Sequence, residues 1–256
     1  MADLVQILLF VLVSSLLGLT GGLVFLKNMK LAHRLSFGVV AFAIGAMLAS
    51  GLLDFLPEAL EKTTVESVVF GTLAGILLFF FIEKFFIWHH HHTYGETEKH
   101  SYNSLIIIGD TIHNFVDGVI LAAAFMISPN IGIPAFLAII FHEIPQEISD
   151  FGLLLAGGMR RGRIILVNIV SALFAVVGAV VAFVFISSVE GMTAPLLAFA
   201  AGAFIYIALS DLIPETKRTV GLGKSALQIL LVIAGILVIW YTGSVAHEFF
   251  EFAHLG

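Results

Sequence analysis

The sequence has 256 residues, of which 59% are hydrophobic and 12% are charged, with 24 Phe, 24 Gly and no Cys. Its mean hydropathy of +1.07 excludes a soluble domain of this size and indicates a polytopic membrane protein. The absence of Cys excludes disulfides and thiolate metal sites, so any metal would be held by nitrogen and oxygen ligands. The net charge of −6 says little by itself, and we expect no nucleic-acid partner.

Eight apolar stretches of about 20 residues each follow one another along the chain, and each could cross about 30 Å of hydrocarbon as a helix. The first lacks a basic n-region and a small-residue cleavage site, so we interpret it as a retained span and not as a signal peptide. The expected fold is an all-α integral membrane protein with eight transmembrane helices. The predicted spans are residues 4–26, 36–58, 66–88, 104–127, 133–157, 164–187, 194–214 and 226–247.

Basic residues gather on one side of this topology. The odd-numbered connections between spans hold 11 of the 12 Lys and Arg residues, and Lys62 is the exception. By the positive-inside rule these connections are cytoplasmic and both termini are extracytoplasmic. The short connections and the retained first span favour the bacterial inner membrane as the location of this multi-pass protein.

Two similar segments lie in the second and seventh spans. The segment 42–46 (FAIGA) leads to Asp54-Phe-Leu-Pro-Glu, and the segment 199–203 (FAAGA) leads at the same spacing to Asp211-Leu-Ile-Pro-Glu. Five spans separate them, so they cross the membrane in opposite directions, as in the inverted repeats of transporters. We predict one transporter domain, 1–256, in a 3+2+3 arrangement. Repeat 1 covers about 4–88, the central helices cover 104–157, and repeat 2 covers about 164–247.

The third connection contains the histidine tract His89–His92 and then His100. Neutral imidazoles in such a tract bind Zn²⁺, Ni²⁺ or Cu²⁺ readily. We interpret residues 89–100 as a cytoplasmic metal-collecting or sensing loop. The alternative is a purification tag, although tags sit at chain termini.

Metal-seeking side chains are densest in the fourth and fifth spans, in the segments 110–118 (DTIHNFVDG) and 142–150 (HEIPQEISD). Helical spacing stacks residues four apart on one face, which pairs His113 with Asp117 and His142 with Gln146. Facing the two helices therefore predicts one cluster of His113, Asp117, His142 and Gln146. A second cluster beside it would contain Asn114, Glu143 and Glu147.

Two imidazoles with carboxylate and amide oxygens suit a borderline divalent ion such as Zn²⁺ or Fe²⁺. Pro145 removes a backbone hydrogen bond in the middle of the fifth span, which frees a carbonyl and permits a kink. One polar side chain in a span could equally make an interhelical hydrogen bond, but so many at helical spacing favour a metal site.

Six further carboxylates near these helices allow two readings. Asp110 and Asp150 would pack between helices or line a vestibule. The other four would cap helices at the membrane interface or line the metal path: Asp54, Glu58, Asp211 and Glu215.

The segments 113–118 (HNFVDG) and 142–150 (HEIPQEISD) resemble those of the ZIP (Zrt/Irt-like protein) divalent metal transporters. The subgroup with HNxxDG and HExPHExGD is the most similar, and the likeness extends to the eight spans and the His-rich connection. The chain departs from that pattern at Gln146, where His is common, and at Ser149, where Gly is common. Gln146 makes the metal preference open, and Ser149 would relax a close helix contact.

The resemblance implies a binuclear metal site, uptake toward the cytoplasm and an elevator-like movement of a unit that includes spans four and five. It places one metal on His113, Asp117, His142 and Gln146, and the other on Asn114, Glu143 and a shared Gln146. We therefore predict a non-enzymatic transporter of Zn²⁺, with Fe²⁺, Mn²⁺ and Cd²⁺ as further substrates. The expected partners are the metal ions and the lipid bilayer, and a homodimer is compatible with the sequence.

Two other functions compete with this one. A membrane-embedded zinc hydrolase would use His142 as ligand and Glu143 as general base, but Gln146 replaces the second His of an H-E-x-x-H motif. A metal sensor or scaffold would use the histidine tract but would leave the polar stripes within the spans unexplained.

Overall fold

The computed structural model describes residues 3–92, 98–189, 191–217 and 221–254, with side chains described outside 85–102 and 245–254. Every regular element in this part of the chain is a helix, as predicted. The helices are α1 (Leu4–Lys27), α2 (Met29–Ala49), η1 (Ser50–Phe55), α3 (Leu56–Lys62), α4 (Val65–His92), α5 (Glu98–Ile127), α6 (Pro129–Ala156), α7 (Arg161–Ser188), α8 (Thr193–Ile207), η2 (Ala208–Leu212), α9 (Ile213–Lys217) and α10 (Leu222–His254).

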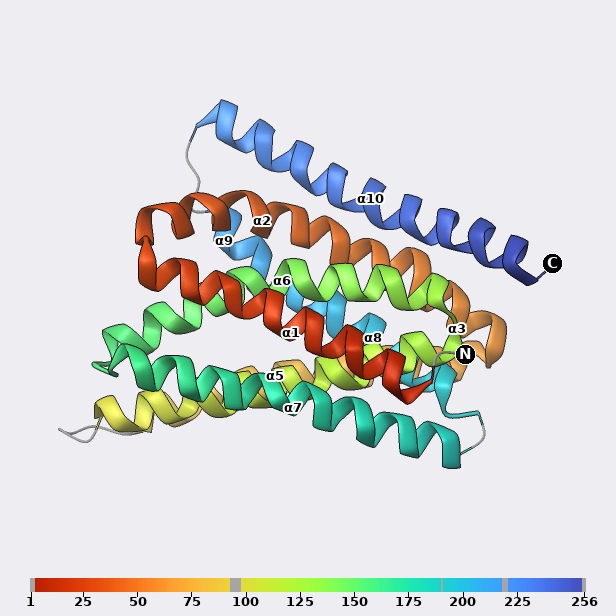
Figure 1. Ribbon diagram of the computed structural model, residues 1–256, viewed down its shortest axis with the longest axis horizontal. Coiled ribbons are helices and arrows are strands. Elements are labelled where there is room, and N and C mark those ends of the chain that lie inside the picture. Colours follow the sequence, from red (N-terminus) through yellow and green to blue (C-terminus); the bar gives the residue numbers. More distant parts are fainter. Residues whose placement is uncertain (1–2, 93–97, 190, 218–220, 255–256) are drawn as a thin grey trace.

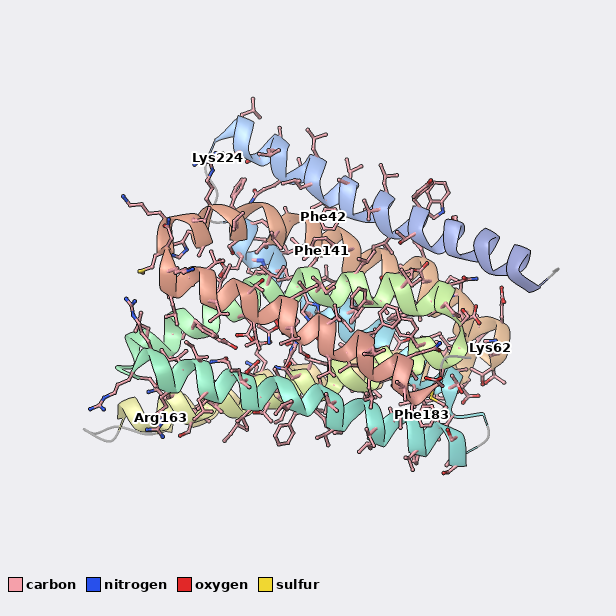
Figure 2. The ribbon with its side chains drawn as sticks, in the orientation of Figure 1. Phe42, Lys62, Phe141, Arg163, Phe183 and Lys224 are labelled. Carbon is pink, nitrogen blue, oxygen red and sulfur yellow. The ribbon has the colours of Figure 1, made fainter. Side chains whose placement is uncertain are left out.

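Eight helical segments among the described residues are long and apolar enough to cross a membrane. The eight predicted spans are therefore confirmed, with α2, η1 and α3 forming one span and α8, η2 and α9 another. The start of α1 and the end of α10 lie at the same end of the bundle (Figure 1). Lys62 lies at that end, whereas Arg163 and Lys224 lie at the other (Figure 2). We call the end that carries Arg163 and Lys224 the basic end.

The predicted loop at 89–100 is wrong in its bounds. Helix α4 continues to His92 and α5 begins at Glu98. The extension has a simple cause, because no Gly or Pro interrupts the sequence between Gly75 and Gly95. The metal role predicted for His89–His92 and His100 depends on side chains that lie outside the described residues.

Each Asp-x-x-Pro-Glu segment begins in a π-helical turn inside a span, with Asp54 in η1 and Asp211 in η2. Pro57 and Pro214 follow η1 and η2 closely. A proline lacks an N–H and its ring collides with the carbonyl four residues earlier. The wider π turn accommodates both effects, and it accepts hydrogen bonds from one residue further on. The spans therefore continue through their prolines.

The outer helices pack in two equivalent pairs, α4 with α8 and α10 with α2. A Cβ atom on Gly45 would overlap the carbonyl oxygen of Val232, and one on Gly202 would overlap that of Thr72. The partner helices repeat this, because Gly75 lies against Phe199 and Gly235 against Phe42 in the same way. Two inverted copies of one packing unit would produce such matched contacts.

The two helices with the polar stripes, α5 and α6, pack mainly against α7 and α1. Glycines again set the distance between the packed helices. Gly118 lies against the carbonyl of Ala175, and Gly21 lies against the carbonyl of Ile144. These backbone contacts fix α5 and α6 beside each other in the interior of the bundle, and there the metal-seeking side chains meet.

Candidate metal centre

Four of the six predicted ligands converge at one point between α5 and α6. Ligand atoms of His113, Asp117, His142 and Glu143 all lie within 4.8 Å of one another. His142, Asp117 and Glu143 are buried, and the imidazole of His113 closes one side of the group. We call these four residues the tetrad.

The spacing within the tetrad suits one small cation. Nε2 of His142 lies 3.1 Å from Oδ2 of Asp117 and 3.0 Å from Nε2 of His113. Oε1 of Glu143 lies 3.8 Å from Nε2 of His113 and 3.9 Å from Nε2 of His142. Ligands about 2.1 Å from a tetrahedral Zn²⁺ lie about 3.4 Å apart. The observed distances bracket this value.

The backbone of α6 sets the tautomer of His142. Nδ1 of His142 lies 3.0 Å from the carbonyl oxygen of Ala138, one turn earlier. A carbonyl only accepts, so Nδ1 carries the proton and Nε2 presents its lone pair to the tetrad in the neutral ring. Imidazoles that bind metals are commonly oriented by such a hydrogen bond.

The carboxylates of the tetrad lack hydrogen-bond donors. Among the described residues, neither carboxylate oxygen of Asp117 has a hydrogen-bond partner, and Oε1 of Glu143 has none either. Buried carboxylate oxygens without a donor are rare because desolvation is costly. Nε2 of His113 and Nε2 of His142 are within hydrogen-bond distance of each other. A cation at the centre of the tetrad would replace that bond and satisfy the carboxylate oxygens at the same time.

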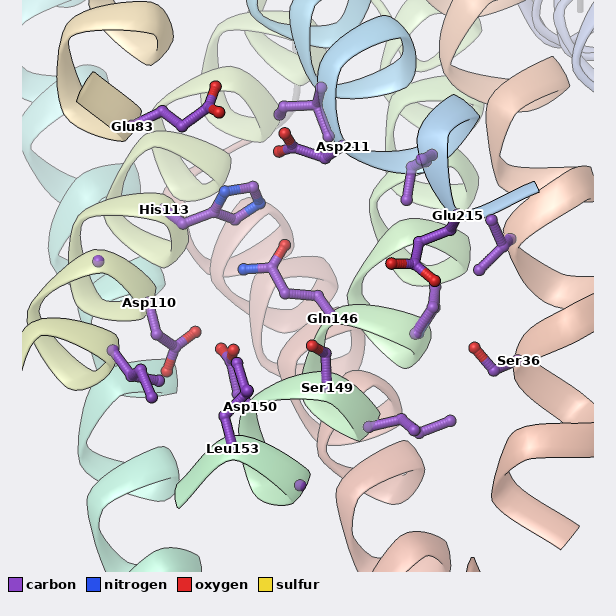
Figure 3. A pocket seen from close by; sticks show the side chains of 18 of the residues that line it. Ser36, Glu83, Asp110, His113, Gln146, Ser149, Asp150, Leu153, Asp211 and Glu215 are labelled. Atoms are coloured by element: carbon purple, nitrogen blue, oxygen red, sulfur yellow. The ribbon is translucent and has the colours of Figure 1, made fainter. Parts of the chain in front are cut away.

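The other two predicted ligands lie on either side of the tetrad. Gln146 lines a cavity that opens beside His113, and its side chain points into that cavity (Figure 3). Asn114 donates through Nδ2 to Oδ1 of Asp110, 2.8 Å away, and to the backbone oxygen of Asp110. The sequence placed Glu143 in a second cluster with Asn114, but the structure brings Glu143 into the first.

A void of about 10 Å³ lies behind the tetrad, lined in part by Asn114, Asp117, Glu143 and Ser14. Its size is that of about one water-sized sphere. Ser14 comes from α1 and was missed in the sequence, where nothing distinguishes it from Ser15. Glu147, also predicted for the second cluster, is buried with Oε2 lacking a partner among the described residues, but it does not line this void.

On the other side, a cavity of about 820 Å³ extends from His113 to the junction of α1 and α2, lined there by Phe25, Met29 and His33. We call it the basic-end cavity. Asp110, Asp150, Asp211 and Glu215 all line it, which favours the vestibule and path readings over capping. Asp54 and Glu58 do not line it. Ser149 points into the cavity and so does not lie in the close helix contact that the sequence predicted (Figure 3).

Glu83, on α4, was not among the residues that the sequence singled out. It lines the basic-end cavity and accepts hydrogen bonds from the hydroxyls of Tyr206 and Ser210 on α8 and η2. The sequence signal that could have identified Glu83 is a carboxylate within an apolar span.

Comparison with known proteins decides the family. The sequence profile of the ZIP zinc transporters matches residues 102–242, more than half of the chain and both helices of the tetrad. The chain belongs to the ZIP zinc transporter family. It is 33% identical over 215 residues to zinc transporter ZIP13 of Pongo abelii, a match that covers 78% of this chain and 64% of that protein.

Shorter matches connect this ZIP protein with two other relatives. Zinc transporter ZIP4 of Mus musculus is 44% identical over 110 residues, which covers 43% of this chain and 16% of that protein. Zinc transporter foi of Drosophila melanogaster is 35% identical over 150 residues, which covers 57% of this chain and 21% of that protein. The ZIP chain thus spans less than two thirds of each of these relatives.

Proposed function

We propose that this ZIP protein carries Zn²⁺ across the membrane, and that the tetrad is its binding site. The observation that carries the proposal is the convergence of ligand atoms from His113, Asp117, His142 and Glu143 within the spans, where three of the carboxylate oxygens lack a hydrogen-bond partner among the described residues. Relatives that are named zinc transporters support the choice of metal.

The path we propose begins at the end of the bundle that carries Lys62. A hydrated ion exchanges water for the ligands of the tetrad and then leaves through the basic-end cavity. This cavity opens where the basic residues gather, so the positive-inside rule makes its mouth cytoplasmic and the direction uptake. In this structure the tetrad communicates with the basic-end cavity through His113. Entry from the other end therefore needs a second arrangement of the helices, so that access to the tetrad alternates between the two ends.

Gln146 and Asn114 complete the proposed binding set. Gln146 lines the cavity next to His113 and would receive the ion through its amide oxygen as the ion leaves. Asn114 and Glu143 line the small void, which has room for one further ion. Because an amide oxygen is a harder ligand than imidazole, we propose Fe²⁺ and Mn²⁺ as additional substrates. We propose Cd²⁺, a softer ion, on the strength of the two imidazoles of the tetrad.

The same site argues against the hydrolase alternative. A catalytic zinc ion keeps one position open for water beside three protein ligands. In this chain Glu143, which would be the general base, is itself a member of the tetrad. We propose a transporter and no enzyme, located in the bacterial inner membrane because the connections are short. We also propose that two copies of the chain form a homodimer, with which the sequence is compatible.

Flux of Zn²⁺ into proteoliposomes, read by a trapped fluorescent chelator, tests the function. We expect saturable flux in the natural protein and its loss in Asp117→Ala combined with His142→Ala, with the protein still in the membrane. Glu66→Gln, at an exposed position in the first turn of α4, is the control and should transport normally. Competition by Fe²⁺, Mn²⁺ and Cd²⁺ gives the substrate range. Natural rates in the double variant would refute the site.

A further inference from the structure

The basic-end cavity is larger than passage of a metal ion requires. Its volume is about 820 Å³, whereas six water molecules around an ion fill about 200 Å³ at about 30 Å³ each. Cavities of about 300–1,000 Å³ with mainly apolar walls and a few polar groups are typical of sites for small organic molecules. The walls here include Phe25, Val40, Phe79 and Ile148.

The charge of the lining determines which organic molecules would enter. Among the described residues, the lining of the cavity holds five carboxylates and no Lys or Arg, so it favours cationic over anionic ligands. Anionic chelators are therefore repelled and organic cations attracted. The carboxylates of the lining are Glu83, Asp110, Asp150, Asp211 and Glu215.

Four of these carboxylates are grouped at two places with the metal path between them, and Glu215 lies to one side of Gln146 (Figure 3). In the view of Figure 3, Glu83 and Asp211 lie above His113 and Gln146, whereas Asp110 and Asp150 lie below. Neighbouring side chains fix one member of each pair. Tyr206 and Ser210 donate to Glu83, and Asn114 donates to Asp110.

We propose that the basic-end cavity is a binding site for an aliphatic oligoamine, a molecule whose ammonium groups are joined by methylene chains. Ammonium groups would bind the two carboxylate pairs while the methylene chain covers the apolar walls between them. A bare metal ion can use only the first of these interactions. A bound oligoamine would cover His113 and close the path from the tetrad to the basic end.

The opposite end of the protein supplies a matched control. Asp54 and Asp211 follow Gly45 and Gly202 at the same spacing, so they are counterparts in the two repeats. Glu83 follows Gly75 by eight residues, and the residue that follows Gly235 by eight is Gly243. That end has Asp54 without a counterpart of Glu83, and Asp54 does not line the basic-end cavity.

The test measures spermine binding to the metal-free full-length protein in neutral detergent by titration calorimetry. We expect saturable binding that is much weaker for hexylamine, which has one ammonium group. Asp211→Asn and Asp150→Asn, from the two carboxylate pairs, should each weaken spermine binding roughly tenfold or more, because each removes a charged hydrogen-bond acceptor. Asp54→Asn makes the same chemical change outside the cavity and should bind spermine like the natural protein.

Three results would overturn this site. They are the absence of saturable spermine binding, equal affinity for hexylamine and spermine, and equal loss of affinity in Asp54→Asn and Asp211→Asn. The last would show attraction to net charge alone. The assay contains no zinc and measures no flux, so its outcome is independent of the transport proposal. If Asp211→Asn and Asp150→Asn both weaken spermine binding, misfolding of one variant does not explain the result.

Discussion

Gly118 of α5 lies against the carbonyl oxygen of Ala175 of α7, and this backbone contact is next to Asp117 of the tetrad. A side chain at this position has no room unless the two helices separate. Helix separation would also shift Asp117 relative to His142, whose Nε2 lies 3.1 Å from Oδ2 of Asp117. Packing of α7 against α5 and the geometry of the metal centre are therefore coupled.

The first prediction concerns this contact. Gly118→Ala should destabilise the protein by about 1–3 kcal/mol, the usual cost of overpacking, and should weaken Zn²⁺ binding. Thermal unfolding in detergent and Zn²⁺ titration measure the two effects. Gly162→Ala, in the first turn of α7, is the control because a Cβ there meets no atom within 4 Å. Equal behaviour of the two variants would contradict the coupling.

The second prediction concerns the matched helix pairs. Gly45→Ala and Gly202→Ala should lower the thermal midpoint by similar amounts, because each introduces a methyl group against a carbonyl oxygen of the partner helix. Gly223→Ala, where a Cβ would meet open space, should be harmless. A large effect in only one of Gly45→Ala and Gly202→Ala would show that the two pairs do not share one packing unit.

The third prediction concerns pH. Metal ligands bind in their deprotonated form, so protons compete with the ion. Zn²⁺ affinity should therefore fall as the pH is lowered from 7.5 to 5.5, because protons compete with the ion for the ligand atoms of the tetrad. Calorimetric titration at both values measures this, and an unchanged affinity would contradict the prediction, because it would show that no ligand of the ion takes up a proton in this range.

The fourth prediction concerns Gln146. Replacing its amide by an imidazole in Gln146→His supplies a better ligand for Zn²⁺, so Zn²⁺ affinity should rise roughly tenfold while affinity for Mn²⁺ does not. Competition titrations with both metals measure the change. The control is Gln228→His on α10, away from the tetrad and the cavity. If Zn²⁺ affinity stays the same, Gln146 does not contact the ion.

The sequence predicted the number of spans well because hydrocarbon thickness sets the length of an apolar helix. It also selected His113, Asp117, His142 and Glu143, because buried ionisable groups at helical spacing are rare without a function. It could not assign Glu143 to its cluster. Helical spacing fixes angles within one helix but not the rotation of α6 relative to α5. That rotation depends on contacts with other helices, such as the one between Gly18 of α1 and Glu143.

The path residues were harder to predict, since they come from distant parts of the chain. Glu83 and Asp211 meet only because α4 packs against α8. The extent of α4 was underestimated because histidines were read as a loop for their chemistry, although they do not break a helix. Capping and path lining have the same sequence pattern near Pro214, so only the cavity separates the two readings.

The glycine contacts of the outer helices have a consequence for lipid adaptation. A glycine that faces a carbonyl across a helix interface can make Cα–H···O contacts of about 0.5–1 kcal/mol each, and hydrocarbon offers no competing donor. The pairs α2–α10 and α4–α8 are thus held in part by backbone atoms. Residues on their exposed sides, such as Phe70 and Leu230, can therefore change with the thickness and fluidity of the host bilayer while the pairs keep their geometry.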